Sequence, residues 1–116
     1  MNLNKAKQLC RSLPGATEDI KWGADLVFSV GAKMFACTGN GDDADGISFK
    51  VDDERFLELT DRPGIIAAPY LARVKWVKIV DLKAVSDAEA GALLKRSHEL
   101  VFGKLTKKLQ REIGDA

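Results

Sequence analysis

Apolar residues near the start of the chain recur every three or four positions, which is the spacing of one helical face. This face consists of Leu3, Ala6, Leu9, Cys10 and Leu13. The Pro14-Gly15 pair that follows is a typical helix stop. The pattern predicts a helix over residues 3–13.

Alternation of apolar and polar residues predicts strands in the next part of the chain. The segments LVFSV (26–30) and KMFACT (33–38) are joined by Gly31-Ala32, a two-residue link suited to a tight β-hairpin. Ile47, Phe49 and Val51 then alternate with polar residues as a third strand. We therefore expect three antiparallel strands in succession.

Helical patterns return in the second half of the chain. Asp52 can cap a helix over residues 53–61 that Pro63-Gly64 ends. The positions of this helix expected to face inward are Phe56, Leu57 and Leu59 or Thr60.

A second, longer helix is predicted from Ser86, because Ser86 and Glu89 have the spacing of a capping box. Its inward stripe is formed by Ala90, Leu93, Leu94, Ser97, Leu100 and Val101. Gly103 interrupts it, and a short basic helix follows with Leu105, Leu109 and Ile113 at four-residue spacing.

The segment PYLARVKWVKI (69–79) interleaves cations with apolar residues. Its Trp76–Val80 part is the best strand candidate, and we expect the first half to project from the sheet as a ribbon. Such a ribbon would place Arg73, Lys75 and Lys78 on phosphates and an aromatic ring on a base. A strand whose lysine stems pass a half-buried Trp76 explains the same pattern, and for Trp76 packing at the sheet margin is the stronger interpretation.

These elements predict an α+β fold in the order α-β-β-β-α-β-α-α, with a two-layer antiparallel β-sheet and flanking helices. The 116 residues are 46% apolar, which suits a single domain over 1–116. Apolar runs are too short to cross a bilayer, and the N-terminus lacks the apolar stretch of a signal peptide. We expect a cytoplasmic protein without a membrane partner, in which Cys10 and Cys37 are reduced core thiols.

Charge is distributed unevenly along the chain, although the net formal charge is only +1. Residues 62–111 carry a net charge of +7, whereas residues 1–61 carry −4. This segregation permits a basic face, and pairing between the two halves would explain it equally well. The basic final helix is likewise either a phosphate-contacting helix or a solvated amphipathic one.

Catalytic and metal-binding patterns are weak. His98 is the only histidine, and nothing in the spacing supplies the nucleophile and orienting partner that a general base needs, so we expect a hydrogen-bonded, partly buried side chain. Asp43, Asp45, Gly46 and Asp52 match later positions of an EF-hand loop, but Gly41 occupies its first ligand position. Walker and Rossmann patterns do not occur. We expect a protein that is not an enzyme and that uses no metal or cofactor.

Four segments together carry a family resemblance: LCRSLPGATED (9–19), WGADLVFSVGAKMFA (22–36), RPGIIAAPYLARVKWVKI (62–79) and SHELVFGKLTKKL (97–109). In order and spacing they resemble the MmcQ/YjbR family. The resemblance implies a small protein with an antiparallel sheet and flanking helices, similar in topology to secretion chaperones. It also implies DNA binding by β-ribbons, a description of the family that rests on fold comparison.

The resemblance selects Trp22-Gly23, Gly31, Lys33-Met34-Phe35, Pro69-Tyr70, Lys75-Trp76 and Ser97. Two positions depart from the family pattern: Lys75 stands where many members have His, and His98 where many have Tyr.

The favoured hypothesis is a nucleic-acid-binding module, with DNA as the partner and phosphate contacts dominant. The candidate binding residues are Arg73, Lys75, Trp76, Lys78, Lys104, Lys107 and Lys108. The alternative is a small adaptor domain that receives a protein partner on Tyr70, Trp76 and the exposed part of the sheet. In either case we expect a monomer or weak dimer.

Overall fold

The computed structural model describes residues 1–21, 25–39 and 46–114. The first helix, α1, spans Leu3–Ser12, one residue shorter than expected. It begins after Asn2, whose side chain accepts a hydrogen bond from the Lys5 amide at 2.8 Å. This capping bond satisfies one of the amides that the first helical turn leaves unpaired.

Six strands form one sheet in the spatial order β1-β2-β3-β4-β6-β5, and every neighbouring pair is antiparallel. The predicted strands are confirmed as β2 (Asp25–Val30), β3 (Lys33–Gly39), β4 (Ile47–Lys50) and β6 (Trp76–Ile79). The two edge strands, β1 (Ala16–Lys21) and β5 (Ile65–Ala67), were not predicted. The first is largely exposed and lacks apolar alternation, and the second has only three residues.

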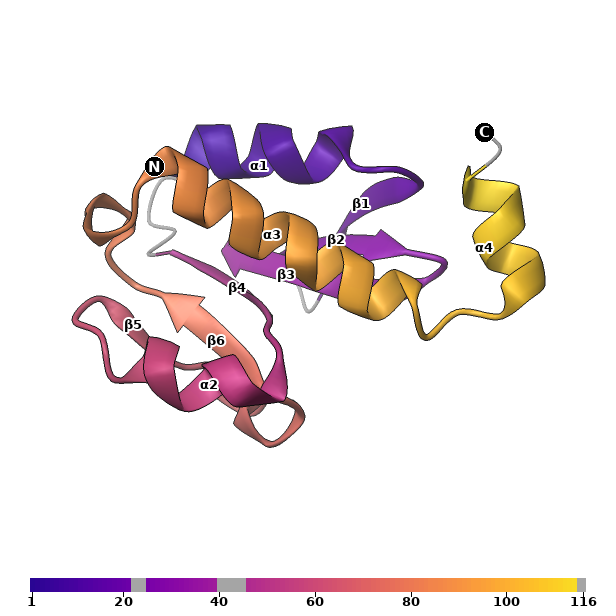
Figure 1. Ribbon diagram of the computed structural model, residues 1–116. Helices are drawn as coiled ribbons and strands as arrows, with labels where there is room; N and C mark the ends of the chain where they lie inside the picture. The colour runs from indigo at the N-terminus through magenta and orange to yellow at the C-terminus, as the bar shows by residue number, and fades with distance from the viewer. Residues whose placement is uncertain (22–24, 40–45, 115–116) are drawn as a thin grey trace.

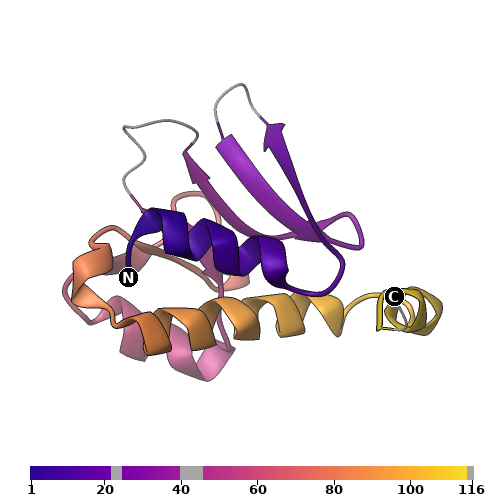
Figure 2. The same ribbon diagram turned by 90° about the horizontal axis from the view of Figure 1, so that it is seen from above.

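The remaining helices are α2 (Asp53–Thr60), α3 (Asp87–Phe102) and α4 (Lys107–Gly114), with single 3-10 turns at Ala72–Val74 and Leu82–Ala84. Figures 1 and 2 show α1, α2 and α3 over one face of the sheet, with α4 set apart beyond the end of α3. The expected α+β fold, an antiparallel sheet with flanking helices, is confirmed.

The main core lies between this helical layer and the sheet, where Phe28, Phe35, Phe49, Leu59 and Leu94 are fully buried. Two predicted inward positions are corrected by the structure. Leu57 is 78% exposed because it lies on the outer side of α2, and on α3 the buried stripe includes His98, while Leu100 is only half-buried.

A β-bulge interrupts the alternation of β3. The register pairs Phe28 with Ala36 but Ser29 with Met34, so Phe35 is the extra residue. Phe35 and Ala36 are both fully buried in the core cluster. A bulge of this kind re-aims side chains, and here the residues on either side of the pair, Met34 and Cys37, both line the opposite face of the sheet.

The two capping predictions are confirmed only in part. The Ser86 hydroxyl accepts a hydrogen bond from the Glu89 amide at 3.1 Å, as in a capping box. The Glu89 carboxylate binds Arg62 instead of returning to Ser86. Asp52 precedes α2 without capping it, because its carboxylate binds Arg96 of α3 at 3.0 Å.

Candidate functional site

The segment expected to project as a ribbon forms a tight turn instead. Residues Ala72–Val74 make a 3-10 helix, and Lys75 follows in a left-handed conformation with φ 64°. The amides of Val74 and Trp76 both donate to the Leu71 carbonyl, which closes this turn onto itself. The prediction of an extended first half is therefore wrong, and regular strand alternation begins only at Trp76.

Trp76 itself is 4% exposed and lies opposite Lys50 in the β4–β6 register. A ring buried to this extent has no free face for a base, so the structure places Trp76 as a packing residue. Lys50, which the sequence pattern does not single out, is the cation at this point of the sheet.

The end of β4 at Lys50 lies beside the turn that contains Lys75, and the charge of Lys104, just after α3, acts on Lys50. We call Lys50, Lys75 and Lys104 the basic corner. The ammonium group of Lys50 donates to the Val74 carbonyl at 2.6 Å, and the Lys75 carbonyl accepts from the Val51 amide at 2.9 Å. Burial lowers the pKa of Lys50, and the nearby Lys104 lowers this pKa further, while Asp53 opposes the effect. The fold therefore holds two ammonium groups close together against their mutual repulsion.

Lys75 is positioned by an aromatic ring. Its ammonium nitrogen lies 5.1 Å from the centre of the Phe56 ring on α2. Such a cation–π contact attracts the ammonium group to the ring face without an acidic partner. Lys75 is half-buried.

Pairing between the two halves of the chain explains only part of the charge segregation. Arg96, in the basic segment, binds Asp52 in the acidic first half. Arg62 instead binds Glu89, which lies in the same basic segment, at 2.6 and 2.8 Å. Over residues 1–21, 25–39 and 46–114, no ion pair involves five of the six cations predicted to bind phosphate. These are Arg73, Lys75, Lys104, Lys107 and Lys108.

The predicted cations do not form one continuous surface. Arg73 and Lys104 are exposed close to or within the basic corner, and Lys107 and Lys108 are exposed on α4. Lys78 is separate from them, because it lines a pocket on the open face of the sheet. For Lys50, the alternation of apolar and polar residues along β4 was the one feature of the sequence that could have assigned it to the polar face of the strand.

His98 is hydrogen-bonded, as predicted, and more fully buried than expected. Its Nε2 lies 2.7 Å from the Pro14 carbonyl, and since a carbonyl only accepts, Nε2 is the donor. The ring packs edge-on to Phe35 and stacks on Phe102. Within the described part of the chain, His98 makes no hydrogen bond to either cysteine.

The two cysteines are free thiols in different environments. Burial raises the pKa of Cys10 to about 12, which fits its predicted place in the core. Cys37 corrects the prediction, because it is only half-buried and lines the pocket on the open face. The calcium-loop residues Gly41, Asp43 and Asp45 lie outside the described residues, as do Trp22 and Gly23.

Among the described residues, histidine, cysteine and acidic side chains form no cluster able to hold a metal ion. Within the same ranges, every helix is too short or too polar to cross a bilayer.

The family model for YjbR matches residues 11–100. The chain belongs to the YjbR family. No curated protein matches it. Among solved structures, the YjbR-family chain is similar to protein DR2400 from Deinococcus radiodurans, which carries the domain DUF419. The TM-score is 0.85 at 30% identity, covering 97% of this chain and 88% of that one.

A protein from Pseudomonas syringae shares the fold, with a TM-score of 0.72 at 22% identity over 87% of this chain and 99% of the other. These matches extend the YjbR architecture to nearly the whole chain.

Proposed function

We propose that this YjbR-family protein binds nucleic acid, DNA in the first instance, by placing phosphates in the basic corner. The observation that carries the proposal is the pairing of a partly buried Lys50 with a second lysine: burial lowers the pKa of Lys50, and the charge of Lys104 lowers it further. A phosphate between these ammonium groups would replace repulsion with two charge-assisted hydrogen bonds. Arg73 and Lys75 extend the same surface along the turn before β6.

In this proposal the protein acts by binding, without a catalytic step, and phosphate contacts supply most of the affinity. The corner lies at the meeting point of a strand end, a 3-10 turn and a helix end, so it presents no helix or ribbon suited to reading bases in the major groove. Binding should therefore be strongly salt-dependent and weakly sequence-specific.

The adaptor alternative receives less support. It used Tyr70 and Trp76 as a shared aromatic surface, and Trp76 is buried. Tyr70 remains fully exposed, so only one of the two aromatic side chains is accessible to a partner protein.

The test is a fluorescence-anisotropy titration of a labelled DNA duplex and of its single strand, repeated over a series of salt concentrations. The test variant is Lys75→Ala/Lys104→Ala, and the matched control is Lys21→Ala/Lys83→Ala. The control removes the same charge from exposed residues of β1 and of the turn after β6. The test variant should reduce the slope of log K against log salt by about 1 for each phosphate that the protein no longer binds.

Two results would overturn the proposal. One is the absence of binding by the unmodified protein at low salt. The other is an equal loss of affinity in the test variant and in the control, which would indicate that only net charge matters. A third variant, Lys107→Ala/Lys108→Ala, measures whether α4 contributes to the same surface.

A further inference from the structure

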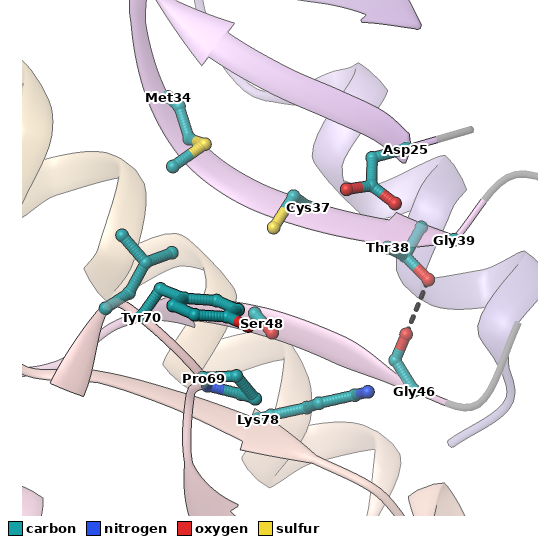
Figure 3. A pocket seen from close by; sticks show the side chains of 11 residues that line it. Asp25, Met34, Cys37, Thr38, Gly39, Gly46, Ser48, Pro69, Tyr70 and Lys78 are labelled. Atoms are coloured by element: carbon teal, nitrogen blue, oxygen red, sulfur yellow. Dashed lines mark hydrogen bonds between the residues drawn. The ribbon is translucent and has the colours of Figure 1, made fainter. Parts of the chain in front are cut away.

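A pocket of about 450 Å³ opens on the face of the sheet away from the helical layer (Figure 3). This volume lies within the range of sites that bind small organic molecules. The registers place Cys37 opposite Ser48 and Ser48 opposite Lys78, so one cross-strand row forms the floor. The bulge at Phe35 adds Met34 to the same face.

The two ends of the pocket differ in chemistry. Met34, Pro69 and Tyr70 lie at one end in Figure 3, whereas Asp25, Thr38 and Lys78 lie at the other. Burial raises the pKa of Cys37 between them, and the Asp25 charge raises it further, so this thiol stays neutral at pH 7. The pocket thus has an apolar, sulfur-rich half and a polar half containing a carboxylate.

Tyr70 forms the outer wall and is the most unusual residue of the pocket. Its side chain is fully exposed, with a relative exposure of 103%, and its backbone has φ 66°. The Leu71 amide donates to the Ala68 carbonyl at 3.1 Å, so Pro69 and Tyr70 are the central residues of a turn. Proline followed by a residue with positive φ is the type II arrangement, in which glycine normally takes the second place.

Neither packing nor turn chemistry explains a tyrosine at this position. Glycine would adopt the same backbone without strain, and an exposed ring gains nothing from burial. The turn holds a flat aromatic ring at the pocket, which Tyr70 lines (Figure 3).

We propose that this pocket binds a nucleobase, with the ring stacked on Tyr70 and an exocyclic amine directed to the Asp25 carboxylate. An aromatic ring stacks on tyrosine and makes favourable contacts with the sulfur atoms of Met34 and Cys37. Asp25 makes no ion pair within the described residues and accepts hydrogen bonds only, so it selects N–H donors. The site uses none of the basic-corner lysines and does not rest on the proposed phosphate contacts.

The first experiment measures binding of adenosine, guanosine, cytidine and uridine by calorimetry and by amide shifts in NMR spectra. Nucleosides carry no phosphate, so a failure of the basic corner would not affect this result. At least one of the three bases with an exocyclic amine should bind, and uridine, which lacks that amine, should bind about fivefold more weakly or worse. Absence of binding by all four, or binding of uridine as tight as that of the others, would overturn the proposal.

Variants then test the two named contacts. Tyr70→Gly should weaken nucleoside binding by about fivefold or more, because the stacking ring is removed. The same change should not lower the melting temperature, because relief of the positive φ offsets the added freedom of glycine in the unfolded chain. Tyr70→Phe should retain binding. Asp25→Asn should weaken binding, whereas Asp19→Asn on β1 should leave it unchanged.

Unchanged binding in both Tyr70→Gly and Asp25→Asn would place the ligand elsewhere and overturn the site. A fall in melting temperature for Tyr70→Gly would show that the tyrosine is retained for stability, which also contradicts the argument.

A competition experiment shows whether the nucleobase that the pocket binds belongs to a free nucleoside or to a nucleic-acid strand. If a short single-stranded oligonucleotide displaces the bound nucleoside and its duplex does not, the pocket binds a base of a single strand. If neither displaces it, the pocket binds a free nucleoside. Either result supports the ring site, since the nucleoside must first bind there.

Discussion

The Ser97 hydroxyl donates a hydrogen bond of 2.6 Å to the carbonyl of Phe35, the bulged residue of β3. The same hydroxyl accepts a hydrogen bond from the Lys50 amide of β4 at 2.9 Å. Ser97 is fully buried, so one side chain of α3 satisfies two backbone groups of neighbouring strands. Because the bulge places Met34 and Cys37 on the open face, this bond also shapes the pocket there.

Replacing Ser97 with alanine should destabilise the fold, because the Phe35 carbonyl and the Lys50 amide both lose a partner. We expect a loss of about 1–3 kcal/mol in the free energy of unfolding, measured by chemical denaturation. Ser12→Ala, at an exposed position of α1, is the control and should change stability by less than about 0.5 kcal/mol. Equal stability of Ser97→Ala and the unmodified protein would mean that water replaces the hydroxyl.

Gly31 should be sensitive to substitution as well. It has φ 57°, and an added Cβ would lie 2.7 Å from a methyl carbon of Leu105, the residue that leads into α4. Gly31→Ala should reduce stability by about 1–2 kcal/mol through the left-handed backbone alone. Ala32 has φ 66°, so Ala32→Gly, the matched control in the same turn, should be neutral or stabilising in thermal unfolding. A neutral Gly31→Ala variant would contradict this account.

Much of the fold could be predicted because local patterns and tertiary packing agree there. The helical stripe of α1, the hairpin between β2 and β3 and the cap at Ser86 all follow local rules. The edge strand β1 could not be predicted, because its pairing with β2 is a tertiary effect on a polar, exposed segment. The bulge at Phe35 was also not predicted, and the partner of its carbonyl, Ser97, lies far away in the sequence on α3.

The candidate site could be predicted less completely, for a related reason. Arg73, Lys75 and Lys104 were found from charge, but the placement of Arg73 and Lys75 depended on a 3-10 turn that resembles a strand in sequence. Lys50 was missed because proximity to Lys104 is a property of the fold and not of spacing along the chain. Tyr70 was selected from the sequence as a partner-binding residue, but its positive φ is a property of the fold that the sequence did not predict.

The Arg62–Glu89 pair should make stability depend on pH in the acidic range. The hydrogen bonds from Arg62 lower the pKa of Glu89, and burial partly opposes them. A carboxyl group with a lowered pKa stabilises the folded state above its unfolded pKa, and this contribution disappears as pH falls through the folded pKa. Chemical denaturation at a series of pH values should show this loss in the unmodified protein and not in Glu89→Gln.

The effect should be modest, about 1 kcal/mol or less, because both side chains are about one-third exposed. Glu58→Gln is a suitable control, since its pair with Arg55 joins neighbouring turns of α2. It should leave the acidic pH profile nearly unchanged. An identical loss in Glu89→Gln and the unmodified protein would assign the pH dependence to other carboxylates.

Removing Lys104 should separate binding from stability. Since Lys104 lowers the pKa of Lys50, Lys104→Ala should raise that pKa, as measured by NMR titration of the lysine side-chain carbons. Lys108→Ala, which removes the same charge from α4, should not. Because the pKa of Lys50 is lower in the folded state than in the unfolded state, the free energy of unfolding rises with pH between these two pKa values. This pH range should narrow in Lys104→Ala.

Nucleic-acid affinity should fall in Lys104→Ala without loss of stability at neutral pH, because Lys104 repels Lys50. A variant that loses affinity only by unfolding would contradict a phosphate-binding role for the basic corner.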